Sequence, residues 1–315
     1  MNDLARMQRA YAVIRGRDLP TSYPLSFQLP GVVDLHVHVG VGLSAPLDLA
    51  RHATEAGMRA LVFKTPSPTL DLARTVNEAL ALLYQGSGKT PVECFGGVVL
   101  ETAGPPPPEL ARRWLAKGAR VVWFATGSSA NHRRRAHGLS WAAARREGQY
   151  VLRRGQLIPD AVAVIETAIE YGAALSFGHL SREEVLALAA EAERRGLRSA
   201  FVDHPLNPVM GLTIEDCARI ASHGVFLNFT AAEFSPLFGI DPADIARAIR
   251  AAGVEQVVLS SDAGHPVMGD PAEAMRCWRA IALWQGFSDA EIWRMMCDQP
   301  ARLLGLPAVA PPATG

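Results

Sequence analysis

Two histidines stand one residue apart in the segment GVVDLHVHVG, residues 31–40. Residues i and i+2 of a β-strand point to the same face, so a strand here would project His36 and His38 side by side. Neighbouring imidazoles are typical ligands of a transition metal, but two histidines can also share a strand by chance. The pair therefore gains weight only if other donors lie near it.

Further polar residues stand at the ends of other short apolar segments. They are Lys64 in LVFKT, Glu101 in VVLE, His179 in FGHL, Asp203 and His204 in VDHP, Asn228 in VFLNFT, and Asp262 and His265 in SSDAGH. Taken singly, His179 or His204 is more often a partly buried structural histidine, and Asp262 could cap a helix. Taken together, imidazoles and a carboxylate form the ligand set of Zn²⁺, with Mn²⁺, Fe²⁺ or Co²⁺ as alternatives.

The segments that carry these residues recur in a regular order along the chain. Strands are predicted for residues 31–39, 59–65, 92–101, 120–126, 174–180, 199–205, 225–230 and 256–265. Amphipathic helical segments lie between them, and most end in glycine. Strands that are apolar throughout suit a parallel sheet buried on both faces. The pattern predicts an α/β protein with a (β/α)₈ TIM barrel, in which all strand ends share one mouth.

The barrel is predicted to occupy residues 31–306, after an N-terminal extension (residues 1–30) with a short helix and before a tail (residues 307–315). An extra C-terminal helix is expected in SDAEIWRMMCDQPARLLGL. The link after the fourth strand, residues 127–157, is far longer than the usual 2–6 residues of such loops. We predict that it acts as a lid or specificity loop. Its His132 and Arg133 are predicted to contact a substrate.

Composition excludes several other classes of protein. Lys plus Arg and Asp plus Glu both number 31, so net charge favours neither nucleic acid nor a membrane surface as a partner. The four cysteines form no CxxC pair, which is typical of a reducing compartment. No signal-peptide pattern and no apolar stretch of about 20 residues is present. We expect a cytoplasmic protein that binds a small-molecule substrate and forms a homo-oligomer.

The segments DLHVH, FGHL, VDHP, SSDAGH and QPARLLGL, which span residues 31–306, resemble the amidohydrolase superfamily of metal-dependent hydrolases. The resemblance implies that His36, His38 and Asp262 hold a buried divalent metal, with Zn²⁺ the first expectation. It also implies that His179 and His204 either hold a second metal or contact the substrate of a single-metal site. One or two metals per chain are therefore expected.

One feature departs from that family. Two-metal members commonly place a bridging carboxylated lysine or glutamate at the end of strand 4, but here that strand ends VVWFAT. Lys64 on strand 2 could serve as a carbamate bridge, because a desolvated lysine is easier to deprotonate. It could instead remain an ammonium that contacts an anionic substrate, or the site could hold one metal. Glu101 is a weaker bridge candidate and could be purely structural.

The resemblance further implies cleavage of an amide, cyclic amide or lactone bond by a metal-activated water, with Asn228 and His265 as further substrate contacts. Asp262 would take the proton of the water, and His204, His179 or the metal would polarise the oxygen under attack. A single-metal decarboxylase or other lyase, or a phosphoesterase, is the alternative activity. A catalytically inactive barrel that serves as a binding module would be expected to have lost ligands, and none of the five donors is missing.

Overall fold

The structure, a computed structural model, describes residues 28–40, 44–265 and 267–308. The predicted N-terminal helix and residues 309–315 of the predicted tail lie outside these ranges. All eight predicted strands are present, each somewhat shorter than its segment. They are β1 (Val33–His38), β2 (Ala60–Lys64), β3 (Glu93–Val99), β4 (Val121–Trp123), β7 (Ala174–Ser176), β8 (Ala200–Asp203), β9 (Phe226–Thr230) and β10 (Val257–Ser260).

The strands pair in parallel in the order β1-β2-β3-β4-β7-β8-β9-β10. The first and last strands close the barrel by irregular contacts rather than by a ladder. Val37 forms an isolated parallel bridge with Ala263, and the His38 N–H donates to the Ala263 carbonyl over 2.8 Å. The buried Asp34 adds a side-chain link, because its Oδ1 accepts the Ser261 N–H at 3.1 Å. The predicted (β/α)₈ barrel is therefore confirmed.

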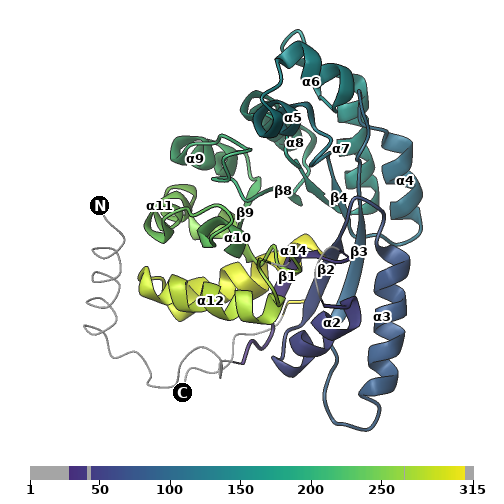
Figure 1. Cartoon of the computed structure of the whole chain (residues 1–315), viewed down its shortest axis with the longest axis vertical. Helices are drawn as coiled ribbons and strands as arrows, with labels where there is room; N and C mark the ends of the chain where they lie inside the picture. Colours follow the sequence, from purple (N-terminus) through teal and green to yellow (C-terminus); the bar gives the residue numbers. More distant parts are fainter. Residues whose placement is uncertain (1–27, 41–43, 266, 309–315) are drawn as a thin grey trace.

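Helices cover the outside of the strands (Figure 1). They include α2 (Pro46–Glu55), α3 (Leu70–Leu83), α4 (Pro108–Ala116), α7 (Pro159–Tyr171), α8 (Arg182–Arg195), α9 (Ile214–Ser222), α10 (Ala231–Phe234), α11 (Pro242–Ala252) and α12 (Pro271–Trp284). A short 3₁₀ turn, η2 (Val254–Gln256), precedes β10. Within the described ranges, no helix is both long and apolar enough to cross a bilayer.

The core has two layers, because both faces of the strands are buried. Leu61 and Phe63 of β2 face the helices, whereas Val33 and Leu35 of β1 belong to the cluster inside the barrel. The predicted C-terminal helix is present as three consecutive pieces: α13 (Asp289–Trp293), the π-helical η3 (Arg294–Asp298) and α14 (Gln299–Leu303). Leu303 joins the inner cluster, so this segment closes the end of the barrel opposite the mouth.

The predicted long link after β4 folds as a compact insertion. It contains α5 (Ala130–His137), α6 (Trp141–Glu147) and an antiparallel pair of β5 (Leu152–Arg153) and β6 (Gln156–Leu157). Local sequence explains both helix starts, because Ser129 Oγ accepts the His132 N–H at 3.0 Å and Ser140 Oγ accepts the Ala143 N–H at 3.2 Å. The role of the insertion as a lid stays a prediction.

Candidate metal centre

Three side chains from opposite ends of the chain meet at the mouth of the barrel. His36 and His38 come from β1, and Asp262 follows β10. The Nε2 atoms of the two histidines are 3.1 Å apart, and Asp262 Oδ1 lies 3.2 Å from His36 Nε2 and 3.1 Å from His38 Nε2. A single oxygen and two nitrogens therefore form a nearly equilateral triangle.

The triangle fits a transition metal. Zn²⁺ binds imidazole nitrogen and carboxylate oxygen at about 2.0–2.2 Å, so neighbouring ligands of a tetrahedral site are about 3.3 Å apart. The three atoms here have nearly that spacing. Two imidazoles and one carboxylate also leave a fourth position open, as catalytic zinc sites do. The residues present therefore suit a divalent cation.

The backbone after β10 aims Asp262 back across the barrel. Asp262 has a φ of +53°, a left-handed conformation that is uncommon for residues other than glycine. Gly264 nearby has a φ of +97°, and a Cβ on it would meet the His38 carbonyl oxygen at 1.8 Å. His204, at the end of β8, also has a positive φ, of +33°. Such strained positions cluster at functional sites.

Asp203 fixes the orientation of His36. Its Oδ1 lies 3.1 Å from His36 Nδ1 and accepts Asn228 Nδ2 at 2.7 Å, while its Oδ2 accepts Trp123 Nε1 at 3.0 Å and Ser176 Oγ at 2.7 Å. The carboxylate is buried and receives donors from four strands. An Nδ1–H held in this way leaves Nε2 of His36 as a lone pair that faces the mouth, the usual arrangement of a metal-binding histidine.

Lys64 reaches the same ring nitrogen from β2. Its buried Nζ lies 2.9 Å from His36 Nε2 and 5.9 Å from the centroid of the Trp123 ring. The predicted convergence of Lys64 with the histidines is thus present in the geometry. Whether Lys64 bridges metals, contacts substrate or does neither stays a prediction.

A second group of histidines lies beside the first. His179 Nε2 and His204 Nε2 are 3.2 Å apart, and the His204 ring centroid is 5.8 Å from that of His36. His132 of α5 lies with its Nδ1 2.8 Å from His179 Nδ1, so the insertion orients His179 much as Asp203 orients His36. Nδ1 of His204 is buried without a hydrogen-bond partner. The predicted roles of His179 and His204 as ligands or substrate contacts stay predictions.

Burial keeps these groups in the protonation states that metal binding requires. It lowers the pKa of His38 to about 3 and that of His204 to about 4, and it lowers the pKa of His179 well below its usual value. Burial acts to raise the pKa of Asp262, but the nearby His36 and hydrogen bonds outweigh it and hold that pKa well below the usual range. His38, His179 and His204 are therefore neutral at neutral pH, whereas Asp262 is ionised.

The predicted substrate contacts lie in four different settings. Asn228 is fully buried beneath the mouth and is committed to Asp203, with its Oδ1 unpartnered. His265 is partly exposed at the rim, its ring 4.1 Å from that of His38. His132 contacts His179, and Arg133 pairs with Glu147 of α6 at 3.4 Å. None of the four roles is tested by this geometry.

Glu101 has a structural task. Its carboxylate accepts the backbone N–H groups of Thr126 at 2.9 Å, Gly127 at 3.1 Å and Ser128 at 2.8 Å. Burial acts to raise its pKa, but these hydrogen bonds prevail and the pKa lies below its usual value. Of the two readings of Glu101, the geometry favours the structural one, in which the residue holds the start of the insertion.

Sequence reasoning missed two buried acids beside the site. Asp203 was noted at a strand end without a role, although its position directly before His204 was a signal. Glu233 of α10 accepts the Leu206 and Thr230 N–H groups, each at 2.9 Å, and so supports the segment after His204. Burial raises its pKa to about 8. Thr230 and Glu233 match a capping box, which predicts the contact with the Thr230 N–H. The contact with Leu206, 27 residues away, has no local signal.

Comparison with solved structures defines the class of fold. An amidohydrolase from Pseudomonas aeruginosa matches with a TM-score of 0.55 and 13% identity, over 87% of this chain and 95% of that chain. N-acetyl-D-glucosamine-6-phosphate deacetylase from Mycobacterium smegmatis matches at 0.54 and 19%, over 89% and 77%. A dihydroorotase matches at 0.53 and 17%, over 88% and 72%. The predicted resemblance to amidohydrolases is therefore confirmed in the fold.

A match to a protein-family model assigns the chain to a family. Residues 31–228 match the model of a family of unknown function, DUF6282, and this match spans more than half of the 315 residues. The chain belongs to this family. A comparison with curated proteins finds none that matches.

Proposed function

We propose that the protein is a metal-dependent hydrolase with one divalent cation, Zn²⁺ in the first instance, held by His36, His38 and Asp262. The observation that carries the proposal is the triangle of donor atoms 3.1–3.2 Å apart at the barrel mouth. Within the described residues, these three form the one group of donors compact enough for a metal ion. That supports a single tightly held cation over two.

A bound cation would supply an acidified water and a positive charge for the oxygen under attack. The residues of this chain do the rest. Asp203 keeps the Nδ1 proton on His36, and the Asp262 carboxylate is ionised and placed to accept a proton from a water at the mouth. His204, neutral at pH 7, lies where its imidazole can contact the substrate. Lys64 adds a polar head group that could contact a carboxylate or other anion.

The proposed substrate is a small molecule with an amide, cyclic amide or lactone bond. The protein is proposed to act in the cytoplasm. The fold neighbours that bear the names deacetylase and dihydroorotase support this class as the first one to screen. A single-metal decarboxylase is the second candidate. The absence of a carboxylate at the end of β4, which ends in Trp123, and the single compact donor group both favour it.

Metal content tests the proposal directly. Elemental analysis of the purified chain is expected to give about one zinc per chain, and His38→Ala is expected to lose it. The matched control is His223→Ala, because His223, directly after α9, pairs with Glu193 of α8 and belongs to neither histidine group, so this variant should keep the metal. A chain that contains no metal and gains no thermal stability from Zn²⁺ or Mn²⁺ would instead be a binding module.

Two further measurements separate the activities. Lys64→Ala retains the metal if the site is mononuclear, whereas loss of a second metal on this substitution would establish a bridge. Loaded protein is then screened against amides, cyclic amides, lactones, phosphoesters and carboxylated rings. Release of CO₂ without uptake of water would favour the decarboxylase, and hydrolysis that is lost in His38→Ala supports the hydrolase.

A further inference from the structure

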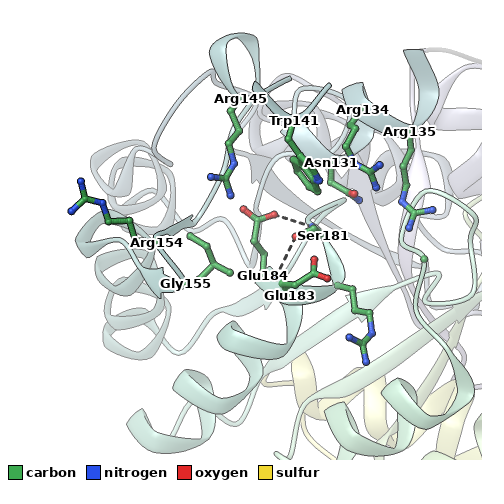
Figure 2. A pocket seen from close by; sticks show the side chains of 13 residues that line it. Asn131, Arg134, Arg135, Trp141, Arg145, Arg154, Gly155, Ser181, Glu183 and Glu184 are labelled. Atoms are coloured by element: carbon green, nitrogen blue, oxygen red, sulfur yellow. Dashed lines mark hydrogen bonds between the residues drawn. The ribbon is translucent and has the colours of Figure 1, made fainter. Parts of the chain in front are cut away.

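A cavity of about 580 Å³ lies apart from the triangle of metal donors, between the insertion and the start of α8. Figure 2 shows its upper wall, where Arg134 of α5 and Arg145 of α6 approach from either side of Trp141. Ser181 and Glu184, at the beginning of α8, form the opposite wall. The cavity is therefore built largely by the insertion that interrupts the barrel repeat.

Both arginines lie beside the Trp141 ring. The Arg134 guanidinium carbon lies 4.6 Å from the centroid of the Trp141 ring, and that of Arg145 lies 5.7 Å from it. A cation–π contact favours a guanidinium beside the ring and leaves its N–H groups free to bind oxygen atoms. Among the described residues neither arginine forms an ion pair, although the adjacent Arg133 pairs with Glu147.

A third guanidinium is positioned by a glycine. Arg135 also lines the cavity, and its Nη1 donates to the Pro208 carbonyl at 2.9 Å. A Cβ on Gly211 would lie 2.1 Å from Arg135 Nη2, so any other residue at 211 would displace this side chain. Gly211 also has a φ of +66°, which disfavours other residues there. Arg135 thus adds positive charge at a fixed place.

Five arginines and two glutamates line the cavity, so its lining carries a net positive charge. Both oxygens of Glu184 are already used, because they accept the Ser181 and Val151 N–H groups, each at 2.9 Å. Glu183 is the other acidic residue that lines the cavity. The 14-residue helix α8 begins here, so its N-terminal dipole adds further positive potential.

We propose that this cavity binds a phosphate group, either the free ion or a phosphate carried by a small organic molecule. Several fixed N–H edges around a common space match a tetrahedral dianion better than a single carboxylate, which one arginine can satisfy. Leu152 and the Trp141 ring offer apolar surface to an organic part. Binding here needs neither metal nor turnover, so it is independent of the proposed hydrolase activity.

Calorimetric titration with inorganic phosphate and, separately, glycerol phosphate tests the proposal on chelator-treated protein. Saturable binding at one site per chain is expected, and the two arms distinguish the free ion from an organic phosphate. The double substitution Arg134→Ala with Arg145→Ala is expected to weaken binding about tenfold or more. Arg146→Ala is the matched control, since Arg146 lies on the same helix but does not line the cavity, and it is expected to bind within about twofold of the unchanged chain.

Arg145→Lys distinguishes directed hydrogen bonding of phosphate from non-specific electrostatic attraction. It keeps the charge but loses the planar fork, so a built site loses affinity whereas simple electrostatic attraction does not. Thermal melting shows whether each variant is folded. The proposal is overturned if the unchanged chain binds neither phosphate, or if folded Arg134→Ala with Arg145→Ala, or Arg145→Lys, binds as tightly as the unchanged chain.

Discussion

The candidate metal centre and the arginine cavity hold their polar groups in opposite ways. At the candidate metal centre, His36 and Asp203 are buried, lie on strands of the barrel and are held by other buried polar groups. At the cavity, Arg134 and Arg145 lie on two short helices of an insertion, are charged, and rest against one indole ring. The first depends on closure of the barrel, and the second depends on how the insertion is attached to it.

This difference predicts how far the effect of a substitution extends beyond its own site. A buried network has no water to replace a lost partner, so one substitution there leaves several groups unsatisfied. A half-exposed arginine can be rehydrated, so its removal should be felt at its own site. Four substitutions test this contrast, and the first two address the buried side.

Asp203→Asn should have the largest effect. The buried carboxylate accepts four hydrogen bonds, two of them from donors that an amide nitrogen would face unfavourably. We expect a loss of about 3–5 kcal/mol in the free energy of unfolding and a roughly 10–100-fold loss of Zn²⁺ affinity, because His36 is no longer held in its tautomer. Urea unfolding and competition with a chromophoric chelator measure the two. Ser176→Ala removes one of the four donors to Asp203 and should lower the free energy of unfolding by about 1 kcal/mol. If it lowered the free energy of unfolding as much as Asp203→Asn does, the Asp203 network would not be cooperative.

Glu233→Gln should change how stability depends on pH. Burial raises the pKa of Glu233 from 4.5 to about 8, so the folded chain retains a proton that the unfolded chain releases. The unchanged protein therefore loses stability from this group as pH rises from 4.5 to about 8, and the loss is complete above that range. Glutamine cannot ionise, so the stability of the variant relative to the unchanged chain should improve across this window. Urea unfolding at several pH values would contradict this if the difference stayed constant.

Glu101→Gln tests the attachment of the insertion. One amide oxygen can still accept N–H groups, but the amide nitrogen would face the Ser128 N–H. We expect a loss of about 1–3 kcal/mol in stability, with Zn²⁺ affinity unchanged within about twofold because the strands that carry the metal donors are not altered. Hydrogen exchange should increase in residues 127–157. A large fall in metal affinity would show that the two regions are more tightly coupled than proposed.

Arg135→Ala should have the smallest effect on stability. The exposed side chain gives one hydrogen bond to the Pro208 carbonyl, so its loss should cost about 0.5–1 kcal/mol or less. Thermal unfolding measures this. If Arg135→Ala destabilised the protein as much as Glu101→Gln does, the cavity wall would respond like a buried polar network. The proposed difference between the two regions would then be wrong.

Much of the architecture could be predicted because its signals are local. Apolar segments such as GVVDLHVHV and QVVLSSDAGH end in polar residues, and parallel strands bring such ends to one mouth. That His36, His38 and Asp262 form one group among these residues was implied by the resemblance to amidohydrolases. The insertion was visible as a link too long for its place. The predicted domain limits, the homo-oligomer and the identity of the metal stay predictions.

Other contacts could not be predicted. His36 and Asp203 are 167 residues apart, and their 3.1 Å contact depends on which strand-end side chains turn inward after closure. Glu101 could have been a bridge or a structural carboxylate, and its contacts with the Thr126–Ser128 amides, which favour the structural role, are visible only in the fold.

The sequence alone determined the repeat, the strand ends and the types of donor that stand there, because hydrophobic period and residue chemistry are properties of short segments. The tertiary structure decided which donors share a point in space, which carboxylate orients which imidazole, and which arginines of the insertion surround a common cavity. These depend on the backbone turns at Asp262 and Gly211 and on packing between distant segments, where a shift of one residue would point a side chain elsewhere.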